Sequence, residues 1–453
     1  MGLINKNLAK AYFKYQLFRN LSLLRCIREL ETIQWLSKDK IEKIQFHKLE
    51  AILKQAYQNV LYYRKKFDEL GINPKDIKSF YDYLRIPVLT KTDIQENNSA
   101  FLARNRNKEN LIRNHTGGST GEPLTFYQDE NYLNYSYAGI QLSFGICGYK
   151  AGDKQLFLWG SDADAMVHNG IKGKIIDYLE NSKFINTFNL TEKSLLTYLE
   201  KLYRWSPKFI WGYASSLEML ARFMIKERKP FALKPAAIQS TAEVLTPMQR
   251  KVIESVFSCK VFDRYGCREV GIVAHECSAH QGLHIYSPNN YVEVLDNSNN
   301  PVKDGEIGKI VVTNLNNYAM PFIRYEIGDL GMLVKDKCKC GRNWPRLKKI
   351  VGRVSDTIIS PSGKMIHGEF FTHLFYGFSN VKQFQVVQET QRDLTIKIVK
   401  RAKFSEEQLK FLIQKIHKFG DENFRIKFEF CNQIPAASSG KFRYTISHVN
   451  KDE

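Results

Sequence analysis

The sequence predicts an α/β protein with a smaller α+β unit at its carboxyl end, and three observations support this prediction. Residues 1 to about 90 have helical periodicity. Between about residues 110 and 330, short apolar runs alternate with helix-periodic runs, as strands and helices do in one α/β domain. After Arg353, a pattern of two strands, a helix and a strand begins. We therefore expect a helical N-terminal extension (1–80), a large domain with mixed sheets and helices (81–353) and a small C-terminal domain (354–453).

The elements follow from local patterns along the chain. Residues 40–70 have the apolar spacing of an amphipathic helix, and Gly71 and Pro74 end it. In the α/β region we expect strands at 155–160, 208–213, 236–243 and 260–266, with helices at 191–205 (capped by Thr191) and 215–228. Two antiparallel strands follow at 291–296 and 308–315. The C-terminal unit should contain strands at 382–388, 393–400 and 425–430, and a helix at 405–420.

The chain is basic and its cysteines favour thiols. It contains 67 Lys and Arg against 47 Asp and Glu, a net charge of +20. This excess favours an anionic ligand, a nucleic acid or a membrane surface, although many proteins are simply basic. We recognise no secretory signal, and charges interrupt every apolar run before it could span a membrane. The eight cysteines are therefore expected as thiols in a cytoplasmic protein.

The first 28 residues carry six Lys or Arg and no acid. Apolar residues recur there at helical spacing, at Ile4, Leu8, Ala11, Tyr15, Phe18 and Leu21. Two interpretations stay open. The segment is either a helix packed on its own domain or a helix that lies peripherally on the anionic inner face of the membrane.

A glycine-rich stretch, TGGSTG at residues 116–121, contains more glycine than a turn needs. Because glycine has no side chain, backbone N–H groups can come close to an anion, and Ser119 and Thr120 add hydroxyl donors. Phosphate-binding loops are built in this way. The stretch has neither the Gly-Lys-Ser/Thr ending of a Walker A loop nor the Gly-x-Gly-x-x-Gly of a dinucleotide loop. A plain glycine turn is the alternative.

Further motifs accompany this stretch. They are STAEVL (240–245), DRYGCREVG (263–271), PFIRYEIGDLG (321–331), VGRVSDTII (351–359) and PAASSGKFRY (435–444). Together with TGGSTGEPL, they resemble in type and order the motifs of the adenylate-forming superfamily, which includes acyl-CoA synthetases and peptide-synthetase adenylation domains. RIPVLTKTDI (85–94) and PKFIWGYASSLEMLARF (207–223) resemble the phenylacetate–CoA ligase branch. GRVSDTIISPSGKMIHGEFF (352–371) is most similar to capsular-polysaccharide ligases of the CapK type. The resemblance covers residues 80–445.

This resemblance implies an AMP-forming ligase with a large adenylation domain and a small mobile C-terminal lid. A carboxylate would attack the α-phosphate of ATP to give an acyl-adenylate and pyrophosphate, with Mg²⁺ as the metal cofactor. Thr116, Gly117, Gly118, Ser119, Thr120 and Gly121 would hold the phosphates, with Thr116 also counted as catalytic. Glu122 stands where the family often has Lys or Arg, which puts direct charge assistance at that position in doubt.

Other roles are carried over by motif position. Glu269 matches the carboxylate that helps to hold Mg²⁺, and Tyr265 and Gly266 match the adenine-binding motif. Asp329 matches the aspartate that accepts hydrogen bonds from the ribose hydroxyls. The remaining nucleotide-site candidates are Glu243, Arg324 and Arg353. Without the motifs, each of these charged residues would read as an ordinary solvated or salt-bridged group.

The terminal motif implies a catalytic role for Lys441. In the family this lysine enters the site when the lid closes and contacts the acid and the α-phosphate. The lid would then rotate about a hinge near Val354 to Asp356 to admit the acceptor.

A second set of residues is suited to a structural metal. Cys277, His284, Cys338 and Cys340 form a Cys₃His set that fits tetrahedral Zn²⁺, and some members of the resembled branch have the same pattern. His275 and His280 compete as the fourth ligand. Chance spacing of reduced cysteines is the alternative.

The function then has open alternatives. The CapK-like terminus favours transfer of the acyl group to an amine or hydroxyl in capsule or O-antigen assembly, with a small-molecule or glycan-linked carboxylate as substrate. The phenylacetate branch favours coenzyme A as a thiol acceptor. A non-catalytic nucleic-acid-binding protein would also suit the charge, but we recognise no nucleic-acid module and expect no such partner. Residues 157–166 and Trp211 to Ser215 are expected as walls of the acid pocket.

Overall fold

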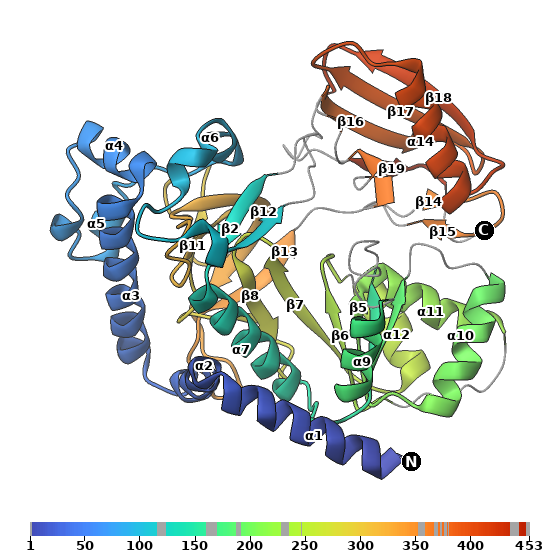
Figure 1. The fold of residues 1–453 in the computed structure, drawn as a ribbon, viewed down its shortest axis with the longest axis horizontal. Helices are drawn as coiled ribbons and strands as arrows, with labels where there is room; N and C mark the ends of the chain where they lie inside the picture. The colour runs from blue at the N-terminus through green and yellow to red at the C-terminus, as the bar shows by residue number, and fades with distance from the viewer. Residues whose placement is uncertain are drawn as a thin grey trace.

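The computed structural model describes residues 2–115, 124–159, 170–186, 192–227, 235–245, 247–351, 358–366, 370–371, 374–375, 378, 380–434 and 444–449. The chain begins with helices, as predicted (Figure 1). These are α1 (Gly2–Arg19), α2 (Leu21–Ile33), α3 (Lys38–Asn59), α4 (Leu61–Glu69), α5 (Phe80–Tyr83) and α6 (Lys91–Glu96), with short 3-10 turns at Pro74–Asp76, Asn98–Phe101 and Lys108–Asn110. Within the described part of the chain, no helix is long and apolar enough to span a membrane.

The helices α3 and α4 share a core with the large sheet. Their apolar faces, including Leu49, Leu53 and Phe67, are fully buried in one cluster with residues of the antiparallel strands such as Val312. The side chain of Gln45 donates hydrogen bonds to the backbone carbonyls of Ser287 and Asn290. The first 80 residues therefore pack as part of the body formed by the residues that follow.

The central element is an 11-stranded sheet with the order β10-β11-β12-β13-β9-β8-β7-β6-β5-β3-β4. Its parallel half contains β3 (Gln155–Trp159), β4 (Ser182–Asn186), β5 (Phe209–Tyr213), β6 (Ala237–Thr241) and β7 (Val261–Cys267). Its antiparallel half contains β8 (Gly271–Glu276), β9 (Leu283–Ile285), β10 (Asn290–Leu295), β11 (Ile307–Asn314), β12 (Tyr325–Val334) and β13 (Arg346–Val351). A separate hairpin pairs β1 (Ile112–His115) with β2 (Thr125–Gln128).

Helices cover both faces of the parallel half. On one face lie α10 (Glu192–Trp205), α11 (Ala214–Lys226) and α12 (Pro247–Phe257), which bury residues such as Ile210 and Ile238. On the other face, α7 (Glu130–Ile146) packs Phe144 against Phe209 and Phe262. The remaining helix, α9 (Ile171–Leu179), contacts β4. Because strand side chains alternate between faces, neighbouring residues of β5, β6 and β7 face different helices.

A second, smaller sheet forms near the C-terminus and has the order β18-β17-β16-β19. It consists of β16 (Val381–Gln388), β17 (Asp393–Lys400), β18 (Arg425–Cys431) and β19 (Thr445–Ser447), and α14 (Glu406–Phe419) packs on it. A short hairpin pairs β14 (Ile358–Ile359) with β15 (Met365–Ile366). Figure 1 draws this unit, in orange and red, apart from the large sheet. The predicted fold class, an α/β protein with a C-terminal α+β unit, is confirmed.

Candidate active site and metal centre

Several predicted site residues lie at the carboxyl edge of the parallel strands. Glu243 lies two residues beyond β6, Tyr265 lies near the end of β7, and Glu269 lies in the turn between β7 and β8. The carboxyl ends of parallel strands meet at one edge of a sheet, which is where ligands bind in open α/β folds. Residues that are far apart in the sequence therefore approach one another here.

Asp329 joins this group from β12. The Tyr265 hydroxyl donates a hydrogen bond of 2.8 Å to Oδ2 of Asp329. Four strand steps separate β7 and β12 in the sheet order, which would be about 19 Å in a flat sheet at a spacing of about 4.8 Å per step. Two side chains of this size do not bridge that distance. The antiparallel half must therefore curl until β12 faces the end of β7.

Glu269 lies on the same side of the fold. Its Oε1 accepts a hydrogen bond of 3.3 Å from the hydroxyl of Tyr325, the first residue of β12. Both Glu269 and Asp329 are partly exposed, so their carboxylates can reach a ligand. The structure thus brings together Tyr265, Glu269 and Asp329, which the motifs assigned to adenine, Mg²⁺ and ribose.

The glycine stretch is attached to this edge through its flanks. Thr116, Gly117, Gly118, Ser119, Thr120 and Gly121 lie outside the described residues, but β1 and β2 on either side pair as an antiparallel hairpin, with His115 opposite Thr125. Gln128, the last residue of β2, donates a hydrogen bond of 2.8 Å to the carbonyl of Arg268, and the hydroxyl of Tyr132 donates one of 3.2 Å to the same carbonyl. The hairpin base is therefore fixed beside Glu269.

Gly266 has a local structural reason to be glycine. A Cβ atom at this position would lie 2.4 Å from the carbonyl oxygen of Gly271, across the irregular pairing of β7 and β8. Such a contact is too close for any side chain. The glycine lets the two strands approach and sets the direction of the turn that carries Glu269.

Arg324 departs from its predicted role. Its side chain is 2% exposed, and its Nε and Nη2 atoms donate to both carboxylate oxygens of Glu293, at 3.1 and 2.9 Å. Its Nη1 donates to the backbone carbonyls of Leu84 and Ile86. All of these hydrogen bonds hold the guanidinium inside the core, which argues against the expected contact with a phosphate or ribose. Arg353, Lys441 and the hinge at Val354 to Asp356 lie outside the described residues.

The predicted metal ligands converge. The ligand atoms of Cys277, His284, Cys338 and Cys340 all lie within 4.8 Å of one another. Cys277 follows β8, His284 lies on β9, and the two remaining cysteines lie in the connection between β12 and β13. Since β9 is hydrogen-bonded to both β8 and β13, neighbouring strands deliver all four groups to one point.

The donor set and its spacing fit Zn²⁺. The sulfur atoms of Cys277 and Cys338 are 3.6 Å apart, and Sγ of Cys340 is 3.3 Å from Nε2 of His284. A tetrahedral ion with Zn–S bonds of about 2.3 Å requires sulfur atoms about 3.8 Å apart. Burial lowers the pKa of His284 to about 4, so its imidazole is neutral, as a metal ligand must be.

The competing histidines have other environments. His280 contacts Oε2 of Glu276 through Nδ1 at 3.2 Å, and His275 is fully buried, with its ring centre 6.2 Å from that of His284. Neither belongs to the four-residue cluster. The structure therefore selects His284, which the sequence could not separate from its neighbours.

Sequence reasoning missed Arg346, which supports this cluster. The side chain is 2% exposed, and its Nη2 donates to Oδ1 of Asp336 at 2.7 Å, while Nη1 donates to the carbonyl of Gln281. It thereby ties the loop after β8 to the connection after β12. A lone arginine at the start of a strand gives no signal of this role, because the pairing partners are distant in the sequence.

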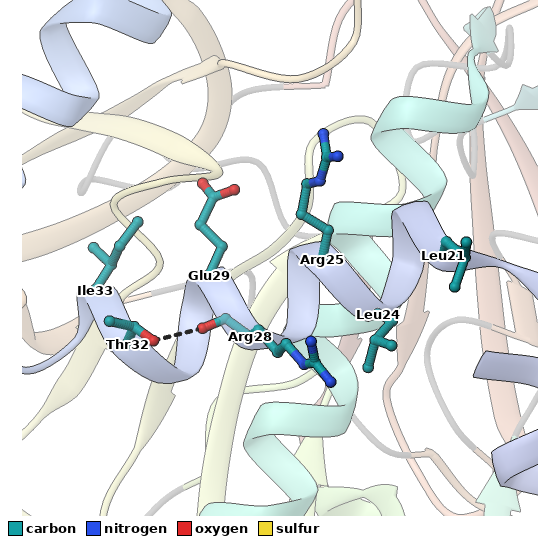
Figure 2. A pocket seen from close by; sticks show the side chains of 7 residues that line it. All are labelled: Leu21, Leu24, Arg25, Arg28, Glu29, Thr32 and Ile33. Atoms are coloured by element: carbon teal, nitrogen blue, oxygen red, sulfur yellow. Dashed lines mark hydrogen bonds between the residues drawn. The ribbon is translucent and has the colours of Figure 1, made fainter. Parts of the chain in front are cut away.

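A shallow surface pocket lies elsewhere, on α2. Figure 2 shows its lining, which is formed by Leu21, Leu24, Arg25, Arg28, Glu29, Thr32 and Ile33. The carboxylate of Glu29 is already bonded to Lys48 and to the hydroxyl of Tyr135. None of the predicted site residues lines this pocket, so it is distinct from the candidate active site.

The fold and the residues gathered at the sheet edge define the class. The whole architecture is similar to that of 2-hydroxyisobutyryl-CoA ligase, solved with 2-HIB-AMP and CoA in the thioesterification state, with a TM-score of 0.63 over 92% of this chain and 91% of that one, at 22% identity. A second structure of the same ligase, in an open conformation, gives a TM-score of 0.60 at 20% identity over 91% of this chain and 93% of that chain. The chain has the fold of adenylate-forming ligases.

The sequence relatives agree with this class. Residues 358–448 match the family model of the CapK C-terminal domain. The chain is 24% identical to Protein CapK of Staphylococcus aureus over 428 residues, which is 90% of this chain and 89% of that protein. It is 27% identical to the phenylacetate-coenzyme A ligase of Thermus thermophilus over 339 residues, 73% and 74% of the two chains. The predicted resemblance and the expectation of an AMP-forming ligase are confirmed.

Proposed function

We propose that this chain activates a carboxylic acid with ATP, releasing pyrophosphate, and transfers the acyl group to an acceptor in the assembly of a capsule or O-antigen polysaccharide. One observation carries the first half of the proposal. Tyr265, Glu269 and Asp329, from separate motifs, meet at the carboxyl edge of the sheet, where the base of the glycine-rich hairpin is also attached. The CapK likeness over 90% of the chain supports the polysaccharide setting.

Each residue then has a chemical task. The loop from Thr116 to Gly121 would bind the phosphates through backbone and hydroxyl donors, and Glu269 would help to hold the Mg²⁺ that neutralises them. Asp329 would accept hydrogen bonds from the ribose hydroxyls, beside Tyr265 at the adenine. Glu243, at the end of the neighbouring strand, would face the nucleotide, and Arg353 would approach its phosphates.

Exchange of labelled pyrophosphate into ATP, measured over a panel of carboxylic acids, tests activation. We expect at least one acid to support exchange, and Glu269→Gln and Asp329→Ala to reduce it by about 100-fold or more, as losses of preorganised electrostatic contacts do. Lys260→Gln is the matched control, because Lys260 is exposed at the entry to β7. A chain that only binds nucleic acid would give no acid-dependent exchange, and this result would refute the proposal.

Coenzyme A is a second candidate for the acceptor of the acyl group. Four of the sequence relatives are phenylacetate-coenzyme A ligases, which favours coenzyme A as the acceptor. Release of AMP should be measured with coenzyme A and with amine- and hydroxyl-bearing sugars as acceptors. Stimulation by a sugar acceptor supports the polysaccharide function, whereas stimulation by coenzyme A alone assigns the chain to the second candidate.

We also propose that Cys277, His284, Cys338 and Cys340 bind one structural Zn²⁺. A closed site with four protein ligands leaves no position for a reacting water, so its role would be to fix loops. The ends of β8 and β9 and the β12–β13 connection would be held together by it. Elemental analysis of protein from metal-replete cells should find about one zinc per chain, and its absence would contradict the proposal.

A peripheral contact with the cytoplasmic face of the membrane is the last part of the proposal. In α1, Leu8, Tyr15 and Phe18 are exposed, Phe18 by 79%, and Leu21 at the start of α2 is 68% exposed. Arg25 and Arg28 follow Leu21 along α2, as Figure 2 shows, and line the same surface pocket. Apolar side chains next to basic ones suit an anionic lipid surface. Flotation with anionic vesicles should recover the full chain but much less of a Phe18→Ser, Leu21→Ser variant; equal recovery would contradict this contact.

A further inference from the structure

Among the described residues, no anionic side chain pairs with Arg264, which lies on the face of the sheet that α7 covers. Arg264 lies on β7, and the carbon of its guanidinium is 4.8 Å from the ring centre of Trp211 on β5. Its Nε and Nη1 atoms are buried and make no hydrogen bond. Desolvation lowers the pKa of this guanidinium to about 10, and the hydroxyl of Tyr286 opposes the shift. Buried charges are normally paired, so Arg264 lacks a group that it needs.

Two neighbours on the same face are also unsatisfied. Nε1 of Trp211 and Oε1 of Gln239 are buried without a hydrogen-bond partner. Trp211 is opposite Gln239, and Gln239 is opposite Phe262, which places these three side chains on one face of β5, β6 and β7. Arg264 follows Phe262 by two residues and returns to that face, because strand side chains alternate. Three adjacent strands therefore bring together two donor side chains, Arg264 and Trp211, and one acceptor, the amide oxygen of Gln239.

The carboxyl ends of β6 and β7 carry residues of the proposed site of adenylation. Arg264 directly precedes Tyr265, whose hydroxyl contacts Asp329. Gln239 lies on β6, four residues before Glu243. The ring of Trp211 packs against those of Phe144 on α7, with centres 5.2 Å apart, and Trp159 on β3, with centres 5.0 Å apart. An acid that reaches the α-phosphate from this side would lie against Arg264 and Trp211, which are partly exposed.

We propose that Arg264 is a specificity-determining residue that binds a second carboxylate on the acid being activated. The substrate class is then a dicarboxylic acid, whose first carboxylate reacts with ATP and whose second pairs with the guanidinium. The planar fork of arginine matches a carboxylate with two parallel hydrogen bonds, and the indole of Trp211 stabilises the fork from one face. This inference rests on the proposed function.

The test compares matched acids in pyrophosphate exchange. Dicarboxylic acids of graded length are each paired with their monomethyl ester, which keeps one reactive carboxylate and loses the second charge. We expect the wild-type chain to prefer the diacid by about 100-fold or more in kcat/KM, because a site built to hydrogen-bond one group rejects the analogue that lacks it. The wild-type preference alone tests the substrate class, whatever the stability of a variant.

Variants then assign the preference to Arg264. Arg264→Gln should abolish or reverse the diacid preference mainly through KM, Arg264→Lys should keep part of it, and Lys260→Gln should leave it unchanged. A change in the ratio of two substrates does not follow from a merely less stable protein. Equal use of diacids and esters by the wild type, or an equal loss for both acids in Arg264→Gln, would overturn the inference while leaving the ligase function intact. If no acid supports exchange at all, the proposed function fails with it.

Discussion

At the scale of single residues, Arg324 and Glu293 form a buried ion pair. Their side chains are 2% and 4% exposed, and the guanidinium binds both carboxylate oxygens. The backbone of Arg324 has φ of +51°, in the left-handed region that is costly for an arginine. Its amide donates to Oγ1 of Thr313, so side chain and backbone are both held by the core. A motif position alone does not separate this structural role from a ligand contact.

Removing one partner of this pair should destabilise the fold strongly. Glu293→Gln leaves the guanidinium buried without a counter-charge, and we expect a loss of about 3–5 kcal/mol in the free energy of unfolding. The measurement is the midpoint of urea denaturation. Glu69→Gln is the control, because its pair with Lys65 on α4 is exposed and contributes at most about 1 kcal/mol. Similar losses in the free energy of unfolding for the two variants would show that the buried pair stabilises the fold no more than the exposed pair does.

Asp263 gives the fold a pH dependence. Burial, with Glu276 nearby, raises the pKa of its carboxyl to about 7, while Arg250 opposes the shift. The folded chain therefore keeps a proton that the unfolded chain releases near pH 4. This contribution to stability is fully present below pH 4 and declines as the pH rises to about 7.

Asp263→Asn tests this contribution, because asparagine resembles the protonated carboxyl at every pH. As the pH rises from 5 to 8, the urea midpoint of the wild type should fall relative to that of the variant. A difference that does not change with pH would mean that Asp263 is ionised in the folded state.

At the scale of elements, the proposed metal centre would link strands that are otherwise joined by few hydrogen bonds. The pairing of β9 with β13 is short, with Arg346 opposite His284 and Leu347 opposite Leu283. If Zn²⁺ bridges these strands, its removal should loosen the loops rather than affect catalytic groups directly. We expect Cys340→Ser to lower the zinc content to well below one per chain and to lower the thermal midpoint by several degrees.

The control for this prediction is Cys431→Ser, since Cys431 is partly exposed on β18, outside the cluster. Chelator treatment of the wild type should reproduce the effect of Cys340→Ser on the thermal midpoint. An unchanged midpoint after proven zinc loss would contradict a structural role.

The elements also show which parts of the fold could be predicted from the sequence. β5 is an apolar run and β6 is buried along its whole length, and both were predicted within one or two residues. β12 contains Gly328, Asp329 and Gly331, and β13 contains adjacent lysines at 348 and 349. Charged residues and glycines interrupt the apolar residues of these two strands, and neither strand was predicted. β4, β8 and β9 were also missed.

The candidate site, too, could be predicted only in part from the sequence. The Cys-x-Cys spacing predicted the metal cluster, but three histidines within ten residues left the fourth ligand open until β9 placed His284. Motif order predicted that Tyr265 and Asp329 share a function, whereas their contact depends on the curl of the sheet. Arg264 had no sequence signal, because its lack of a partner is visible only in three dimensions.

At the scale of the whole molecule, two bodies with separate cores are described. Residues Ile358, Phe371 and Phe384 belong to a C-terminal core that contains no residue of the large sheet. We therefore propose boundaries that leave residues 81–353 as the adenylation domain and 354–453 as the lid, with the helices of residues 1–80 packed on the former. Independent cores are what a rotation of one body against the other requires.

We expect such a rotation to move Lys441 into and out of the active site. The Ser-Ser-Gly-Lys sequence that ends at this residue resembles the family motif whose lysine enters the site when the lid is closed, although Lys441 lies outside the described residues. Its ammonium would contact the acid and the α-phosphate while negative charge grows on the latter. After adenylation the lid would rotate, and the lysine would leave before the acceptor arrives.

Lys441→Ala should therefore separate the two half-reactions. Adenylate formation should slow on the order of 100-fold or more, as for the loss of one preorganised contact to developing charge. Conversion of preformed acyl-adenylate to product should keep nearly its wild-type rate, because Lys441 is no longer in the site. Lys410→Ala, on the exposed side of α14, is the control and should change neither step. Adenylation at the wild-type rate, or equal damage to both steps, would show that this chain does not use a lid with two working positions.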